Sequence, residues 1–143
     1  MEIYQISVFL ENRAGKLSEV TNILAENNID LRAISIAETS DYGILRIIAK
    51  DSQHTVDVLN AHGFIASRTP VLAVGIPDKP GSLAALLDVL AEEKIDVEYM
   101  YSLFGVPNAL ATLVLRIEDI DGAREILKRH GIHIVDFNEF VSR

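Results

Sequence analysis

The sequence contains no cysteine and no tryptophan. Without cysteine the chain forms no disulfide bonds, offers no thiolate to a metal and performs no thiol chemistry. No apolar run approaches the ~18 residues that a transmembrane helix requires. The N-terminal residues follow a strand pattern instead of the basic and then apolar pattern of a secretion signal. We therefore expect a cytoplasmic protein that does not enter membranes.

Positive charge is also scarce. The chain has 13 lysines and arginines against 21 aspartates and glutamates, which gives a formal net charge of −8. A strongly negative protein is repelled by nucleic acids and by anionic membrane surfaces. A small sheet domain that binds RNA needs a basic face with stacking aromatic side chains, and the sequence lacks that combination. We expect no nucleic-acid partner.

The sequence also lacks the common catalytic motifs. It has no Gly-x-Ser-x-Gly, no Gly-x-x-x-x-Gly-Lys and no Gly-x-Gly-x-x-Gly after a strand. His130 and His133 lie close together in the sequence, but no cysteine or carboxylate follows at a metal-site spacing, and zinc sites use three or four ligands. We expect neither an enzyme nor a bound metal or cofactor.

What the sequence does contain is an internal repeat. The segment from Leu10 to Leu17 returns as Ile76 to Leu83 at an offset of 66, and His62-Gly63 returns as His130-Gly131 at an offset of 68. A duplication that keeps its order and gains two residues in a loop, here placed within 104–108, is typical of a tandem repeat. We predict two domains, a first copy at 1–69 and a second copy at 70–143.

Each copy follows the order βαββαβ. In the first copy, alternating apolar residues predict strands at 3–10, 30–37, 44–50 and 64–67. Helical spacing predicts one helix after Gly15 and another that Asp51 or Ser52 caps, and the second copy repeats this order from a strand at 71–76. This order predicts the α+β class, with each copy a ferredoxin-like, four-stranded antiparallel sheet that carries both helices on one face.

In each copy the repeated segment carries a glycine where a strand meets a helix. Glycine tolerates φ > 0 and lets a ligand approach the backbone closely. The first amides of a helix have no partner inside it, and the helix dipole attracts anions to that end. Each turn is therefore a candidate carboxylate site; the alternative is that each glycine only permits a tight turn.

These turns read Asn12-Arg13-Ala14-Gly15-Lys16-Leu17 and Asp78-Lys79-Pro80-Gly81-Ser82-Leu83. The pattern Asn/Asp-x-x-Gly-x-Leu, with the unit length and strand order, resembles the ACT domain, a small regulatory module of amino-acid metabolism. The resemblance covers essentially the whole chain, although Ala14 stands where the family usually has proline. It implies that the two units lie side by side, forming an eight-stranded antiparallel sheet with the helices on one face and effectors bound at the seam.

The resemblance also implies which residues contact the effector. They come from the two turns, from the aspartates before the second strand of each copy, and from an aromatic strand: Glu11, Asn12, Arg13, Ala14, Gly15, Lys16, Leu17, Asp30, Asp78, Lys79, Pro80, Gly81, Ser82, Leu83, Asp96, Tyr99 and Tyr101. The turn amides would bind a carboxylate, and Asp30 or Asp96 would bind an ammonium group if the family geometry places it close to the turn. Alternatively, the aspartates bond only nearby backbone, and the tyrosines pack an interface.

We therefore predict a sensor that binds a free L-amino acid and regulates a partner, which could be a metabolic enzyme. One alternative is a regulatory subunit of an amino-acid biosynthetic enzyme, resembling the small subunit of acetolactate synthase in role. Another is a purely structural dimerisation module. We also predict a homodimer, because apolar residues at alternate strand positions would otherwise leave an exposed patch. The candidates for that patch are Phe9, Ile34, Ile36, Val74 and Leu103.

Overall fold

The computed structural model describes residues 2–38, 40–103 and 110–141, and for Leu103 and Val141 it describes the backbone alone. The chain divides into two compact units, a first unit of Tyr4–Thr69 and a second unit of Pro70–Arg143 with Met1–Ile3. The two-residue insertion that we placed within 104–108 and the side chain of Leu103 lie outside the described residues.

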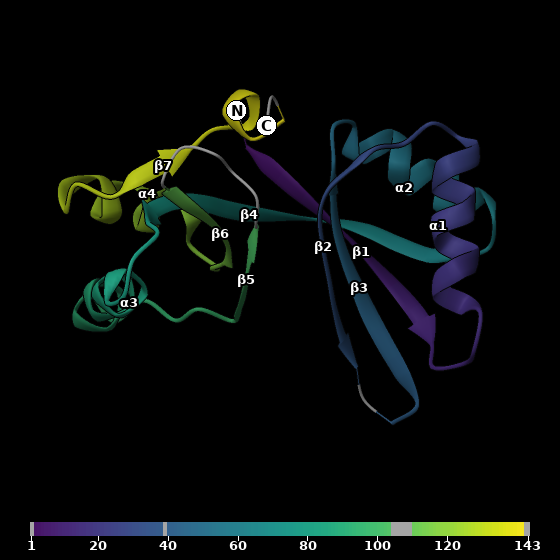
Figure 1. The fold of residues 1–143 in the computed structure, drawn as a ribbon, viewed down its shortest axis with the longest axis horizontal. Coiled ribbons are helices and arrows are strands. Elements are labelled where there is room, and N and C mark those ends of the chain that lie inside the picture. The colour runs from purple at the N-terminus through teal and green to yellow at the C-terminus, as the bar shows by residue number, and fades with distance from the viewer. Residues whose placement is uncertain (1, 39, 104–109, 142–143) are drawn as a thin grey trace. The chain divides into compact units, whose positions relative to one another are not determined.

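The elements follow the predicted order in both units (Figure 1). Those of the first unit are β1 (Ile3–Glu11), α1 (Lys16–Glu26), β2 (Leu31–Glu38), β3 (Tyr42–Ala49), α2 (Ser52–Ala61) and the beginning of β4 (Ile65–Pro77). Those of the second unit are the rest of β4, α3 (Ser82–Glu92), β5 (Tyr99–Leu103), β6 (Leu110–Arg116), α4 (Ile120–Arg129), β7 (His133–Val135) and α5 (Phe137–Val141). The α+β class is confirmed.

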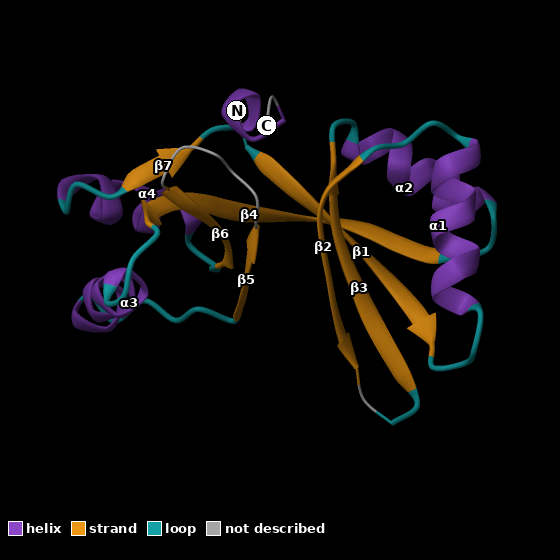
Figure 2. Ribbon diagram, viewed as in Figure 1, coloured by secondary structure: helices purple, strands orange, loops and turns teal. Residues whose placement is uncertain are grey.

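The strand count differs from our prediction of eight. The predicted strands at 64–67 and 71–76 form one strand, the thirteen-residue β4, so the described residues make a sheet of seven strands (Figure 2). The prediction of two separate strands here was wrong, because Pro70 fits extended backbone wherever its missing N–H is not needed. These strand pairings are antiparallel: β1 pairs with β3, β2 with β3, β4 with β6 and with β7, and β5 with β6.

Each unit buries its own apolar core between its helices and its strands. In the first unit, α1 and α2 lie on one side of the strands (Figure 1). Their buried residues include Val20, Leu24 and Leu59, which join Ile6 and Leu45 in one cluster. The helical spacing predicted from the sequence thus places Val20 and Leu24 in the core, whereas Leu17, at the start of the same helix, is exposed.

Val74 belongs to the equivalent core of the second unit and is fully buried there. Its prediction as part of an exposed patch was wrong, because its position on β4 points towards the helices. In the first unit, Ile34 and Ile36 are about half exposed, at 52% and 49%. The register places Ile36 opposite Leu45, a core residue, so the exposed isoleucines share a side of the sheet with the core and not with Phe9.

One short helix was not predicted. Asp136 precedes α5 and accepts a hydrogen bond from the backbone N–H of Glu139 at 2.8 Å, and Phe140 is buried. This helix lies at the end of the described chain, where our repeat analysis assigned only a strand. Within the described ranges, the helices are all too short or too polar to cross a membrane.

Candidate functional site at the strand-to-helix turns

The two turns have the same backbone geometry. Gly15 and Gly81 adopt φ values of 87° and 92°, and they are the N-caps of α1 and α3. Each glycine carbonyl accepts the first helical hydrogen bond, from Glu19 at 2.9 Å and from Ala85 at 3.0 Å. The predicted need for φ > 0 is confirmed, and it explains why glycine occupies both positions.

The helices that follow these turns begin without a side-chain cap. The other two long helices are capped: Asp51 accepts a hydrogen bond from the backbone N–H of His54 at 3.0 Å, and Asp119 accepts one from Gly122 at 3.0 Å. A glycine N-cap has no side chain that could accept from the first amides of its helix. The N-termini of α1 and α3 thus keep donors that a bound anion can use.

The two turns differ in their side chains. In the first turn Arg13 forms an ion pair with Glu11, with 2.9 Å between Nε and Oε2. In the second turn Lys79 takes the place of Arg13, and Pro77 takes the place of Glu11. Among the residues that the structure describes, Lys79 forms no ion pair. Its ammonium group can therefore pair with a ligand.

The first turn is also tied to the loop between β2 and β3. The backbone N–H of Asn12 donates to the carbonyl oxygen of Asp41 at 3.0 Å, and its side-chain amide donates to that of Ser40 at 3.2 Å. The backbone N–H of Asn12, one of the turn amides that we predicted to bind a carboxylate, is thus already used within the protein. At the matching position the second turn has Asp78, which can only accept when it is ionised.

Two cavities border the second turn. The sheet-side cavity, of about 310 Å³, lies between the turn and β5 and β6, and its lining residues are Ile76, Pro77, Asp78, Lys79, Ser82, Leu83, Met100, Tyr101, Ser102, Ala111 and Leu113. The helix-side groove, of about 480 Å³, follows α3, and its lining residues are Ile76, Pro77, Lys79, Pro80, Gly81, Ser82, Ala85, Leu86, Val89, His130 and Ile132. The turn thus has an open space on each side.

The aromatic strand contributes to the sheet-side cavity in a way that we did not foresee. Tyr101 lines it, whereas Tyr99 does not. The register pairs Tyr101 with Val114, and Met100, on the other face of β5, packs against the core under α3. Met100, Tyr101 and Ser102 all line the cavity, so residues of both faces of β5 border it. The alternation of strand residues predicts the two faces, and the contacts of Met100 show which of them meets the core.

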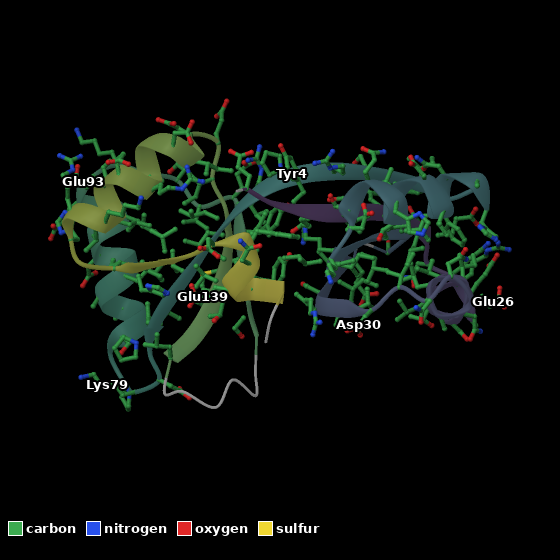
Figure 3. The ribbon with its side chains drawn as sticks, turned by 90° about the horizontal axis from the view of Figure 1, so that it is seen from above. Tyr4, Glu26, Asp30, Lys79, Glu93 and Glu139 are labelled. Carbon is green, nitrogen blue, oxygen red and sulfur yellow. The ribbon has the colours of Figure 1, made fainter. Side chains whose placement is uncertain are left out.

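The structure does not bring Asp30 or Asp96 to the turn of its own unit. Each follows the C-terminal end of an eleven-residue helix, and such a helix is about 16 Å long. Figure 3 shows this separation in the second unit, where Lys79 and Glu93 are labelled at the two ends of α3. Asp30 lies 3.5 Å from the guanidinium of Arg32 and is exposed. Binding of a ligand ammonium by these aspartates stays a prediction.

The histidines of the second unit have separate partners. His130 lies 3.5 Å from a carboxylate oxygen of Glu93, and His133 lies 2.9 Å from one of Glu139. Within the described part of the chain, no three histidine, aspartate or glutamate side chains gather as metal ligands.

Comparisons with known proteins agree with this architecture. The family model described as an ACT domain pair matches residues 1–142. The crystal structure of protein BT0572 from Bacteroides thetaiotaomicron is similar, with 38% sequence identity, a TM-score of 0.90, and coverage of 98% of this chain and 96% of that one. No curated protein sequence matches this chain.

More distant structures share the fold. The regulatory subunit of aspartate kinase from Thermus thermophilus, in its ligand-free form, has a TM-score of 0.67 at 17% identity, with coverage of 90% of this chain and 93% of that one. E. coli aspartokinase III, in complex with lysine and aspartate, has a TM-score of 0.54 at 16% identity, with coverage of 90% of this chain and 31% of that one. With the family match across nearly all of its length, this chain belongs to the family of ACT domain pairs.

Proposed function

We propose that this chain, with domains at 1–69 and 70–143, is a regulatory protein that binds a free L-amino acid at its second turn and does not transform it. The observation that carries the proposal is the uncapped N-terminus of α3 beside Asp78, Lys79 and the sheet-side cavity. An amino acid carries a carboxylate and an ammonium group a few ångströms apart, and this site offers a partner of each sign.

The chemistry of binding follows from these groups. The ligand carboxylate accepts hydrogen bonds from the first amides of α3 and pairs with Lys79. The ligand ammonium pairs with Asp78. The ligand side chain then extends towards Met100 and Ser102, which line the same cavity. A volume of about 310 Å³ suits a free amino acid, since it lies at the small end of the range for ligand pockets, roughly 300–1,000 Å³.

Several predicted features stay predictions. They include ligand contacts from the first turn, from Asp30, Asp96 and Tyr99, binding at a seam between units, and the homodimer. The exposed Phe9 and Tyr42, whose rings stack at 4.9 Å, and the exposed Ile34 and Ile36 supply apolar surface that a second chain could cover.

The direct test is a thermal-shift screen of the purified chain against the twenty L-amino acids, followed by calorimetric titration. A ligand at a hundredfold excess over its Kd stabilises the folded state by about 2.7 kcal/mol, which moves the melting temperature by several degrees. Lysine is a first choice, because it is present with aspartate in the E. coli aspartokinase III structure. If no amino acid shifts the melting temperature at millimolar concentration, the structural-module alternative gains and this proposal fails.

A regulatory subunit is the second candidate function. The Thermus thermophilus chain described as the regulatory subunit of aspartate kinase is matched over 93% of its length, so a chain of this kind serves there as a separate subunit. For the present protein, the test is co-elution with a purified biosynthetic enzyme together with a change in that enzyme's activity. If the chain does not co-elute with the enzyme and does not change its activity, the stand-alone sensor is the better account.

A further inference from the structure

The helix-side groove runs along α3 from Ser82 to Val89. These positions are seven residues apart, which corresponds to about 10 Å of helix. Most of the remaining lining residues are apolar, and the charged or titratable ones stand at the ends, with Lys79 at the turn and His130 near the far end of α3. His130 contacts Glu93, which Figure 3 labels at the opposite end of α3 from Lys79. The groove is thus an elongated apolar space with a cation at its mouth.

In the first unit larger or charged side chains stand at the matching positions and contact one another. Lys16 lies with its ammonium 5.7 Å from the ring centre of Phe64, within range of a cation–π interaction. The same ammonium lies 3.4 Å from a carboxylate oxygen of Glu19. These three side chains come from the start of α1 and from the residue after the second helix's glycine cap, and they occupy the region beside the first turn.

The second unit has a shorter or uncharged residue at each matching position. The repeat offset of 66 aligns Ser82 with Lys16 and Ala85 with Glu19, and the offset of 68 aligns Ile132 with Phe64. All three replacements line the helix-side groove. The groove of the second unit is therefore lined by smaller or uncharged residues at the positions where the first unit carries the ammonium, the carboxylate and the aromatic ring.

We propose that this groove is a second ligand site, and that it binds an aliphatic chain that carries one carboxylate. The carboxylate lies at the mouth, where Lys79 and the uncapped N-terminus of α3 are both available. The aliphatic chain lies along Ala85, Val89 and Ile132 and gains free energy by leaving water.

The lining also selects against an amino acid. Among the described residues that line the groove, none is an aspartate or a glutamate. An ammonium group buried there would have no partner, and an unpaired buried charge is costly. The groove therefore favours a carboxylate without an amino group, whereas the sheet-side cavity, lined by Asp78, suits an amino acid.

The test uses octanoate as the probe, in calorimetric titration of the full chain below the concentration at which it forms micelles. Octylamine has the same chain with the opposite charge and serves as the control ligand. The variant Ala85→Glu/Ile132→Phe carries the residues of the first unit at positions that line only the groove and not the sheet-side cavity. We expect octanoate to bind, octylamine not to bind, and the double variant to lose about tenfold or more in octanoate affinity while it keeps any amino-acid binding.

Three results would overturn the proposal: no octanoate binding, equal binding of octylamine, or unchanged octanoate affinity in the double variant. If the double variant fails to fold, the reciprocal variant Glu11→Gln/Lys16→Ser/Glu19→Ala/Phe64→Ile decides, because its first change also frees Arg13 to pair with a carboxylate. It opens the matching space of the first unit, so two octanoates per chain would support the proposal and one would contradict it. Both proposed ligands place their carboxylate at Lys79 and the first amides of α3, so they would compete, and octanoate is titrated in the absence of amino acids. Loss of amino-acid binding has no part in these criteria, so the groove and the proposed amino-acid site can fail separately.

Discussion

Glu11 holds Arg13 in an ion pair of 2.9 Å at the first turn, and the second turn keeps a cation at the matching position without that carboxylate. An exposed pair of this kind contributes little to stability, typically 0.2–1 kcal/mol. Its consequence for binding is larger, because a cation that is already paired has less to offer an anionic ligand. The two copies of the turn thus share a backbone but differ in their capacity to bind a carboxylate.

Exchanging the carboxylate between the turns tests this difference. We expect Pro77→Glu to give Lys79 an internal partner and to lower amino-acid affinity several-fold, since an opposing charge pair is worth roughly 1 kcal/mol. The matched control is Glu11→Gln, which frees Arg13 and leaves the second turn unchanged. Titration calorimetry measures both affinities. An unchanged affinity in Pro77→Glu would show that Lys79 does not contact the ligand.

Substitution of the two turn glycines tests whether the turns adopt a left-handed backbone. We expect Gly15→Ala and Gly81→Ala each to lower the free energy of unfolding by about 1–2 kcal/mol, because L-residues are disfavoured at φ near +90°. The costs should be similar, since the φ values are 87° and 92° and an added Cβ meets no atom within 4 Å at either glycine. Urea unfolding measures both. Variants as stable as the unmodified chain would contradict the turn geometry.

The N-cap of α4 provides a test of stability at a helix end that we do not expect to bind a ligand. We expect Asp119→Ala to destabilise the fold by about 0.5–2 kcal/mol, because the backbone N–H of Gly122 loses its acceptor. Asp119→Asn keeps a capping oxygen and serves as the control. Both variants should keep ligand affinity, since Asp119 lines neither cavity at the second turn. A stable Asp119→Ala variant would argue against the cap.

Lysine substitutions on the edge strand β2 test the predicted homodimer. We expect a dimer in sedimentation equilibrium at micromolar protein, and weaker association in Ile34→Lys and Ile36→Lys, because these exposed isoleucines are the apolar surface that a second chain could bury. Helix content should be retained, since neither side chain is buried. A stable species of 15.8 kDa, the mass of one chain, would contradict the prediction.

The sequence was sufficient for the repeat, the order of the elements and the conformation of the turns. Gly15 and Gly81 recur before matching helical patterns, and glycine tolerates the left-handed backbone that both positions adopt. These features are local, so spacing and residue type determine them. The α+β class followed from the same local patterns.

The remaining features depend on contacts that are distant in sequence. The segments 64–67 and 71–76 were predicted as two strands, yet β4 continues through Pro70 and joins them. Asp30 was placed near the turn by analogy, whereas the length of α1 separates them. The sequence did not show that Met100, Tyr101 and Ser102 all border the cavity while Tyr99 does not. The groove beside Ile132 required the comparison of two units whose matching side chains differ in size.

The measurement that tests the central claim most directly is calorimetric titration of the L-amino acid that shifts the melting temperature most, into the unmodified chain, Lys79→Gln and Arg13→Gln. We predict saturable binding without turnover, an affinity reduced about tenfold or more in Lys79→Gln, and little change in Arg13→Gln, because only the second turn offers an unpaired cation beside an uncapped helix. Equal affinities in all three proteins, or no binding by any amino acid at millimolar concentration, would contradict this account.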